Sequence, residues 1–352
     1  MAVTRGWRLV LVTVAAAVAC ALWAGPALAC GGLVGPGGTV KLARTTTLAA
    51  WHDGVEHYVT SFEYAGGGAR FGSIVPLPGV PTKVEKGGQW TLQRLVNETQ
   101  PQPAFAAAED AVARQSAGAE VLLQAKVDAL DVTVLRGGGA QVGTWARAHG
   151  FGLTPDAPEV LDFYADRSPI FMAASFDPTR VKARGQQLGQ GTPVHLTIPT
   201  ANPWVPLRIL GLGLGPGEQI KADVYLLTER QPALLQPAGV RLARSEPASA
   251  NLLADLRSDK GMAWLPGEGM WLSWLQVDTA AGGLRRDLAI DATGARQPSA
   301  LAAGLQAPTR PASPLGRLAT PWPLLAALVA LAVAGTAVAG RRLRARAAGR
   351  DR

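Results

Sequence analysis

The chain has 352 residues, of which 48% are hydrophobic and 17% are charged, and its formal net charge is +8. Two arginines near the N-terminus and a net of five positive charges in residues 341–352 supply most of that charge, which leaves +1 for residues 27–340. A nearly neutral body lacks the basic face that nucleic acids require, so we expect no nucleic-acid partner.

The N-terminus has the layout of a secretory signal peptide over residues 1–29. Arg5 and Arg8 precede an apolar stretch, and Ala27-Leu28-Ala29 matches a cleavage site with small residues at its first and last positions. We predict export and cleavage after Ala29, so that the mature chain begins at Cys30. An uncleaved first membrane helix is the alternative, which a helix-breaking glycine–proline pair before the cleavage site disfavours.

Cysteine usage is sparse. Of the two cysteines, Cys20 lies in the predicted signal peptide, so Cys30 is the single thiol of the mature chain and no disulfide can form within it. For Cys30, a free or partner-bonded thiol is favoured over lipidation, because a bacterial lipobox usually has a large aliphatic residue where this chain has Ala27. The domain must therefore be held together by its hydrophobic core.

The first half of the predicted extracytoplasmic domain, residues 30–183, reads mostly as strands. Two alternating runs flank Asp53-Gly54, which is a strong signal for a β-hairpin. Turns rich in glycine and proline delimit further strands, and apolar residues at helical spacing predict short helices. The predicted strands are 39–51, 55–64, 70–75, 126–135 and 170–176, and the predicted helices are 89–97, 105–115, 141–148 and 158–166.

The second half, residues 192–296, continues the strand pattern after a polar loop at 184–191. Hairpins mixed with scattered helices favour an α+β fold, mainly antiparallel β with short helices, over a regular parallel fold. The predicted elements are strands at 194–198, 207–212, 220–227 and 270–277 and a helix at 251–256.

The C-terminal segment predicts a membrane anchor. Residues 297–323 have the Ala, Pro, Gly and Ser content of a semi-extended linker, and residues 324–340 are apolar over about the length of one transmembrane helix. Arginines in the tail, 341–352, should stay on the cytoplasmic side. We therefore expect a single-pass protein of the cell membrane with its N-terminus outside. The arginines that set this orientation are Arg341, Arg342, Arg344 and Arg346.

Two of the four histidines lie beside the predicted hairpin turn. A two-residue Asp53-Gly54 turn would place His52 and His57 on one face of the sheet, diagonally adjacent, and Glu56 on the other face. Two imidazoles can begin a zinc or copper site, although a third ligand is needed, so His52 and His57 are the weak candidates for a metal. The favoured interpretation is polar side chains on the solvent-exposed face of the hairpin, with no metal and no other cofactor.

Motifs that carry catalysis are missing from the sequence. It has neither the Gly-x-Ser-x-Gly elbow of serine hydrolases nor a His-Glu-x-x-His zinc motif. The glycine-rich stretch 211–217 leads into a predicted strand, so we interpret it as a strand connection and not as a dinucleotide loop. Carboxylates are numerous, but spacing alone cannot pair them as catalytic partners. They include Glu63, Asp128, Asp131, Asp162 and Asp223.

Three tryptophans fall close together in the second half: Trp264, Trp271 and Trp274. On one strand Trp271 and Trp274 would face opposite sides, so they cannot both line one sugar-binding platform. Core packing is the favoured explanation for these side chains, and an exposed aromatic patch for a glycan or a protein is the alternative.

Several of these stretches together resemble a known family. Cys30-Gly31-Gly32 directly after a signal peptide, the hairpin at 51–54 and the segment 71–78 (FGSIVPLP) look like the bacterial domain of unknown function 2330 family. Residues 197–210 and 224–228 are similar to its second half, so the resemblance spans about Cys30 to Asp278. It implies an exported, membrane-anchored envelope protein and supplies no catalytic residue. Members often carry a further cysteine near the Cys-Gly-Gly, which this chain lacks.

Two functional classes follow from the sequence. The favoured class is a non-enzymatic binding or interaction module of the cell envelope, with an envelope protein or a glycan as its partner. Near-neutral charge, missing catalytic motifs, a long linker and a tail too short for a folded domain support it. The alternative is an extracytoplasmic hydrolase that acts on cell-wall or peptide material through an Asp/Glu pair, with unknown catalytic residues.

Overall fold

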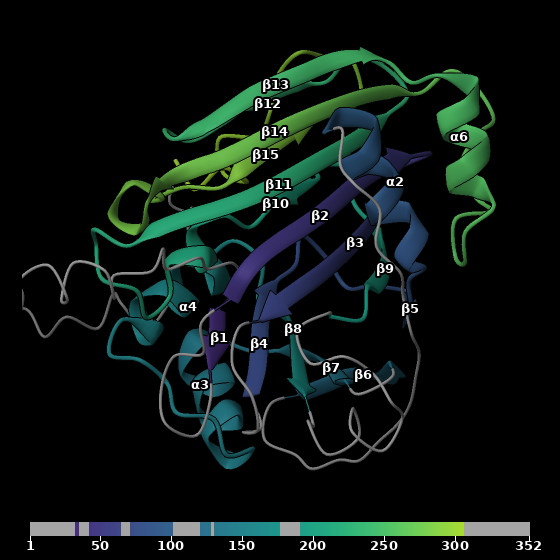
Figure 1. Ribbon diagram of the computed structural model, residues 1–352. Helices are drawn as coiled ribbons and strands as arrows, with labels where there is room; N and C mark the ends of the chain where they lie inside the picture. The colour runs from purple at the N-terminus through teal and green to yellow at the C-terminus, as the bar shows by residue number, and fades with distance from the viewer. Residues whose placement is uncertain are drawn as a thin grey trace, which may run out of the picture. The chain divides into compact units, whose positions relative to one another are not determined.

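The computed structural model describes residues 32–34, 42–64, 71–100, 120–127, 130–176 and 191–305. Their strands form sheets of seven, five and three strands, joined by four α-helices and two 3-10 helices (Figure 1). The predicted α+β class with mainly antiparallel strands is thus confirmed for this part of the chain.

The seven-stranded sheet combines strands from both predicted halves of the domain. Strand β11 pairs with β2 in parallel, and the other neighbours are antiparallel. The two predicted halves of the domain therefore both contribute strands to this sheet. Its order is β13 (Val240–Pro247), β14 (Trp271–Ala280), β11 (Gln219–Thr228), β2 (Leu42–His52), β3 (Val55–Tyr64), β9 (Val194–Pro199), β5 (Lys83–Lys86).

The two smaller sheets are antiparallel throughout. The predicted strand 126–135 is wrong, because two strands occupy it and Val127 pairs with Leu130. The two residues between these strands in the sequence are Asp128 and Ala129. Neither is a glycine or a proline, so the sequence gives no turn signal that would mark the division. The five-stranded order is β1 (Gly32–Val34), β4 (Phe71–Pro76), β8 (Ile170–Phe176), β7 (Leu130–Arg136), β6 (Glu120–Val127), and the three-stranded order is β10 (Trp204–Val205), β15 (Leu288–Asp291), β12 (Ala233–Leu235).

Four helices occupy predicted positions: α2 (Gln89–Thr99), α3 (Gly139–Ala148), α4 (Ala157–Ala165) and α6 (Ala250–Arg257). The predicted helix at 105–115 lies outside the described residues. The N-cap residue of helix α2 is Gly88, which has no side chain to cap the helix. Asp259 supplies the cap instead, since its Oδ2 accepts the backbone N–H of Thr91 at 2.6 Å and the Thr91 hydroxyl at 2.8 Å.

The two faces of the seven-stranded sheet bury separate cores. One face packs into the main core with the five-stranded and three-stranded sheets and with α3 and α4. Helices α2 and α6 cover the other face (Figure 1), where each fully buried leucine stabilises the fold by about 1.5–3 kcal/mol. Buried residues of this smaller core are Leu48, Ala50, Val59, Leu92, Leu95, Tyr225, Leu227, Leu252, Leu253, Leu256, Met262, Leu265, Met270 and Leu272.

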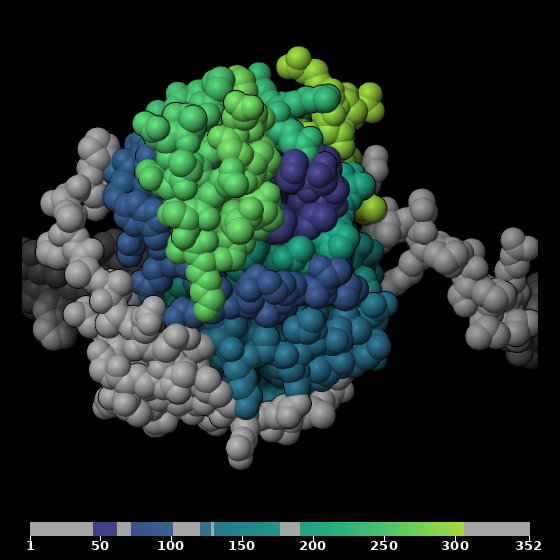
Figure 2. Space-filling model, turned by 90° about the vertical axis from the view of Figure 1, so that its right-hand side faces the viewer, coloured from purple at the N-terminus to yellow at the C-terminus, as the bar shows by residue number. Residues whose placement is uncertain are grey.

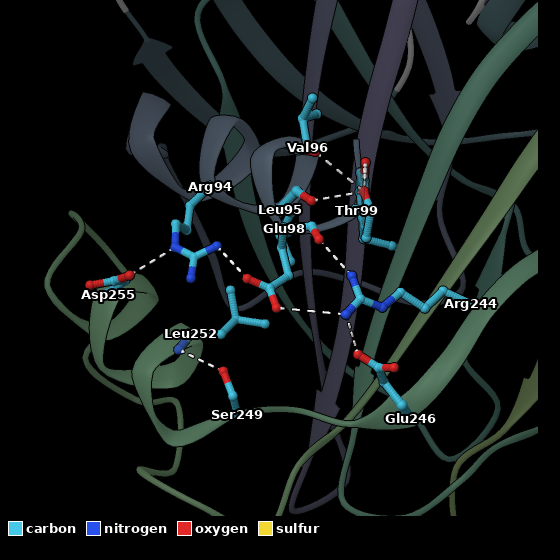
Figure 3. Close-up of polar contacts among 11 residues, drawn as sticks. Arg94, Leu95, Val96, Glu98, Thr99, Arg244, Glu246, Ser249, Leu252 and Asp255 are labelled. Carbon is cyan, nitrogen blue, oxygen red and sulfur yellow. Dashed lines mark hydrogen bonds and ion pairs between the residues drawn. The ribbon is translucent and has the colours of Figure 1, made fainter. Parts of the chain in front are cut away.

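A charged network ties α2, α6 and β13 together at the edge of the smaller core (Figure 3). Arg94 donates to Asp255 at 2.7 Å and to Glu98 at 2.6 Å. Arg244 of β13 donates to the backbone carbonyl of Glu98 at 2.5 Å and pairs with Glu246 at 2.5 Å. These contacts fix both helices against the sheet.

A second polar network lies inside the main core around Asp287, whose side chain is fully buried. Its Oδ2 accepts a hydrogen bond from the Arg167 guanidinium at 2.5 Å. Its Oδ1 accepts from the Tyr164 hydroxyl at 2.8 Å and from the backbone N–H groups of Leu207 at 2.7 Å and Arg208 at 2.9 Å. Both carboxylate oxygens are therefore satisfied.

This Asp287 network corrects another prediction. The expected strand at 207–212 is instead the 3-10 helix η1 (Arg208–Gly211). Asp287 accepts the N–H groups of Leu207, which precedes the helix, and of Arg208, its first residue, and the Tyr164 oxygen accepts the N–H of Ile209 at 2.9 Å. Hydrogen bonds from distant side chains thus override the apolar run that suggested a strand. The second 3-10 helix is η2 (Ala281–Gly283), and stretch 211–217 leads into strand β11, as expected of a strand connection.

The first residues of the predicted linker belong to the folded part. Ala302 and Ala303 are buried, the carbonyl of Ala302 accepts from Arg167 at 2.6 Å, and that of Ala303 accepts the N–H of Asp287 at 3.2 Å. The fold thus continues through Leu305. In the part of the chain that the structure describes, no helix is both long and apolar enough to cross a membrane. The predicted span at 324–340 lies outside that part.

Candidate functional site

One end of the seven-stranded sheet carries a row of ionisable side chains on the face that α2 and α6 cover. We call it the imidazole row: Glu85 of β5, His195 of β9, His57 of β3, His52 of β2 and Glu229, which follows β11. These elements are consecutive neighbours in the sheet. Three of the four histidines of the chain thus lie side by side, with a carboxylate at each end.

The β2–β3 hairpin places the first two imidazoles. Asp53 and Gly54 have φ angles of 49° and 77°, the left-handed pair that a two-residue type I′ turn requires. His57 pairs with Ala50 and His52 pairs with Val55, so both histidines lie on one face, as predicted.

Glu56 points to the other face, opposite Trp51, also as predicted. Both of its carboxylate oxygens are buried without a hydrogen-bond partner, and burial raises the pKa of Glu56 well above its ordinary value. Burial therefore favours the neutral form of Glu56, which faces the main core and takes no part in the row.

Strand pairing brings in the third imidazole and the first carboxylate. His195 pairs with Val59, which sets it diagonal to His57, and Glu85 pairs with His195 directly. Nδ1 of His57 and Nε2 of His195 are 3.0 Å apart, so one of the two rings donates a hydrogen bond to the other. Nδ1 of His195 lies 3.7 Å from Glu85 Oε1, too far for a hydrogen bond, and it has no such partner.

Trp264 covers the middle of the row. Its ring stacks on His57 with 3.6 Å between centroids and 7° between planes, and it lies 6.4 Å from the His52 ring. Trp264 comes from the segment after α6, whose Gly261 passes so close that a Cβ there would meet His195 Nδ1 at 2.9 Å. Figure 2 shows the green atoms of α6 and this segment directly against the purple atoms of the β2–β3 hairpin.

The interpretation of His57 as a solvent-exposed side chain is therefore wrong. His57 is 9% exposed and His195 is 2% exposed, because the segment after α6 closes over the hairpin. Sequence periodicity gives the face on which a strand residue lies, but it does not show whether another segment covers that face.

Burial sets the protonation state of these two rings. It lowers the pKa of His57 to about 3, with further lowering from His195 and His52 nearby. Burial also lowers the pKa of His195 to about 4, although Glu85 opposes this shift and Lys83 adds to it. Both imidazoles are consequently neutral at neutral pH and can accept a hydrogen bond or donate a lone pair to a ligand.

The open end of the row lies at the hairpin turn. Glu229 Oε1 is 2.8 Å from His52 Nδ1 and accepts the backbone N–H of Asp53 at 2.9 Å, while His52 Nε2 lies 3.4 Å from Asp53 Oδ2. We call His52, Asp53 and Glu229 the tip group. Each offers one ligand atom, and these atoms lie within 4.8 Å of one another. The two histidines of the predicted metal pair therefore have different neighbours. His52 belongs to the tip group, whereas His57 contacts His195.

The carboxylates considered for a hydrolase lie on different elements. Asp131 is in β7, Asp162 is in α4, and Asp223 is in β11, where it accepts from Gln100 at 3.0 Å and from Trp274 at 2.8 Å. Glu63 lies in β3, and Asp128 is outside the described residues, as are Ala29, Cys30 and the arginines of the tail.

The other two tryptophans have structural contacts. Trp274 stacks with Tyr225 of the smaller core at 6.4 Å and 10°. Trp271 donates its Nε1–H to Ser245 at 2.9 Å. On β14 they occupy opposite faces, as the odd spacing predicted.

Sequence reasoning missed His195, Glu85, Glu229 and Trp264 as members of the site. No local spacing connects them, because His195 is 138 positions from His57 and Glu229 is 177 positions from His52. The one signal in the sequence is that histidine is rare: with only four histidines in the chain, three of them would rarely lie side by side by chance.

Comparisons with known proteins add a family but no function. A family model described as "Uncharacterized protein conserved in bacteria (DUF2330)" matches residues 24–233. No curated protein matches the chain significantly. The crystal structure of baculovirus P35 is similar at 10% identity and a TM-score of 0.40, covering 72% of this chain and 97% of that chain. A mutated baculovirus P35 after caspase cleavage gives the same identity and score with 71% and 99% coverage. At that score the likeness carries no argument.

Proposed function

This chain belongs to the DUF2330 family of uncharacterised bacterial proteins, and we propose that it is an exported, membrane-anchored, non-enzymatic binding module of the cell envelope that binds its ligand at the imidazole row. The signal-peptide layout of residues 1–29, the apolar stretch 324–340 and the arginines after it support the location. An envelope protein or a glycan is the macromolecular partner that this location favours.

The row itself carries the proposal. Buried polar atoms of native proteins normally have hydrogen-bond partners, and the exceptions call for an explanation such as a bound ion or ligand. Nδ1 of His195 and Nε1 of Trp264, both at the row, are among the buried side-chain atoms of the described residues that have no hydrogen-bond partner.

The protonation state favours binding over catalysis. A general base works best when its pKa is near the operating pH. The pKa values of His57 and His195 are about 3 and about 4, so both rings are weak bases near pH 7. A neutral imidazole that stays unprotonated is suited to holding a ligand.

The binding proposal can be tested on the tagged full-length protein in its own membranes. In-cell crosslinking, gentle purification, mass spectrometry and elemental analysis would show what associates with the wild type and with a His57→Gln/His195→Gln variant. We expect a reproducible, near-stoichiometric associate that the variant loses. The matched control is His149→Gln, which removes the imidazole outside the row and should keep the associate.

Two results would contradict the proposal. The protein could be recovered with no reproducible associate, or the associate could remain on the double variant. Protease treatment of intact cells checks the location separately, because an exported domain is digested and a protected domain would overturn the predicted topology.

A further inference from the structure

We propose that the tip group, His52, Asp53 and Glu229, is a binding site for a divalent transition-metal ion of the zinc type. This inference rests on the proposed function, because it names the ligand class for the open end of the same row. It also uses a ligand set that the sequence alone did not suggest, since only His52 was a candidate.

The ligand types and distances fit such an ion. One imidazole nitrogen and two carboxylate oxygens lie within 4.8 Å of one another. Zinc binds His nitrogen and Asp or Glu oxygen at about 2.0–2.2 Å, so tetrahedral ligand atoms stand roughly 3.4 Å apart. His52 Nδ1 and Glu229 Oε1 are 2.8 Å apart, so small rotations of these side chains can admit the ion.

The backbone around the tip group is held in place before any ion binds. Gly54 accepts the backbone N–H of Thr200 at 3.0 Å, and Trp51 donates to the carbonyl of Thr200 at 3.0 Å. Thr228, which pairs with Trp51, donates to the carbonyl of Arg230 at 2.6 Å and shapes the chain around Glu229. Preorganised ligands lose less conformational freedom on binding, which favours affinity.

Charge and access also suit a cation. Among the described residues, Asp53 and Glu229 each form an ion pair with His52. The neighbouring cation, Arg230, donates instead to the carbonyl of Thr293 at 3.4 Å. Exposed fractions of 29%, 86% and 34% for the His52, Asp53 and Glu229 side chains let an ion enter and leave room for water as a fourth ligand. Three protein ligands plus an open position differ from a closed structural zinc site.

The ligand set favours zinc over calcium or magnesium. Calcium takes six to eight oxygen ligands and magnesium prefers octahedral oxygen, whereas imidazole with carboxylate suits zinc and its neighbours in the first transition row. Copper(II) and nickel(II) should therefore compete with zinc at the tip group, and calcium should not.

The test is a zinc titration of the full-length protein in detergent after treatment with a chelator. We expect one zinc ion per chain in the wild type, and at least about tenfold weaker binding in His52→Gln, Asp53→Asn and Glu229→Gln, since even outer-shell changes cost that much. Two of these variants are chosen to keep the turn: asparagine tolerates the left-handed φ of 49° at position 53, and glutamine at position 229 still accepts the Asp53 N–H. The His149→Gln control should bind like the wild type.

The proposal is overturned if the wild type binds no zinc at micromolar concentration, or if all three tip variants bind as tightly as the wild type. It is also overturned if X-ray absorption at the zinc edge shows only nitrogen ligands, which would place the ion on the buried pair His57 and His195. If zinc does not bind, but crosslinking finds an associate that the His57→Gln/His195→Gln variant loses, the proposed function still stands. Failure in both would remove both.

Discussion

The Asp287 network and the His57–His195 pair of the imidazole row are both buried and polar, yet they differ in how their hydrogen bonds are satisfied. Both carboxylate oxygens of Asp287 have hydrogen-bond partners: Oδ1 accepts three hydrogen bonds and Oδ2 accepts one from Arg167, whose side chain is 4% exposed. In the row, Nδ1 of His195 and Nε1 of the covering Trp264 have no hydrogen-bond partner. A complete network fixes one structure, whereas an incomplete one keeps a capacity to bind.

Their positions in the fold agree with this difference. The Asp287 network joins α4, the start of η1, the residue before β15 and the chain at Ala302, and it holds these four segments together beside the main core. The row lies at the end of the seven-stranded sheet and opens to solvent at the hairpin turn through His52 and Asp53. Substitutions in the first cluster should therefore affect stability, and substitutions in the second should affect pH response and binding.

The largest effect is expected for Asp287→Ala. It leaves the buried Arg167 cation unpaired, and breaking a buried pair from one side costs about 3–5 kcal/mol in the free energy of unfolding. Urea unfolding followed by circular dichroism measures it. Glu268→Gln, at an exposed position, is the control and should change stability by less than about 0.5 kcal/mol. A loss below about 1 kcal/mol for Asp287→Ala would end the structural interpretation of this network.

Acid sensitivity is the second expected effect. The pKa of His195 is about 4 in the folded protein and near 6.5 when unfolded, so the unfolded state binds the extra proton first as the pH falls. Its contribution to stability is complete above pH 6.5 and is lost between about pH 6.5 and 4, by roughly 2–3 kcal/mol at pH 4.5. Glu85, Lys83 and His57 are the groups that act on this ring.

The check for this pH effect is a pair of urea unfolding curves at pH 7 and pH 4.5 for the wild type and for His195→Gln. Ionised carboxylates also respond to acid, but they do so in both proteins. The variant should therefore lose less stability than the wild type between the two pH values. Equal losses would show that burial does not hold His195 neutral.

A smaller effect is expected when the cover of the row is removed. Trp264→Ala should cost roughly 1–2 kcal/mol, because the side chain is only partly buried, and should raise the pKa of His57 towards its ordinary value by admitting water. NMR titration of the imidazole protons reports that pKa directly. Trp264→Phe keeps an aromatic ring over His57 and should leave the pKa of His57 low. The same titration in both variants would show that Trp264 does not shield the row.

The smallest effect is expected at the hairpin turn. Gly54 has a φ of 77° and nothing within 4 Å of an added Cβ, so Gly54→Ala introduces backbone strain alone. We expect a loss of about 1–2 kcal/mol in unfolding free energy, whereas Asp53→Asn should leave stability unchanged. If Gly54→Ala left the unfolding free energy unchanged, the type I′ turn would not hold the tip group in place.

Local patterns predicted much of the fold. The Asp53-Gly54 signal gave the hairpin, its register and the shared face of His52 and His57. Local patterns failed where distant side chains decide the secondary structure. At η1, Asp287 and Tyr164 bind the backbone of residues 207–209.

The site was predictable only in part for the same reason. The hairpin supplies two of its imidazoles, but His195 enters through the pairing of β9 with β3, and Glu229 enters through the parallel pairing of β11 with β2. Neither register can be derived from spacing, because no local turn connects those strands. The cover by Trp264 depends on where the segment after α6 runs, which periodicity does not encode.

The most direct test of the difference between the two clusters is the melting temperature of the full-length protein with and without excess zinc, measured for the wild type, Glu229→Gln and Asp287→Asn. A ligand that binds the folded state raises its stability by mass action. We expect zinc to raise the melting temperature of the wild type and of the destabilised Asp287→Asn variant, and to raise that of Glu229→Gln by less, because this variant binds zinc at least about tenfold more weakly. A rise in Glu229→Gln equal to that of the wild type, or none in the wild type, would contradict the account.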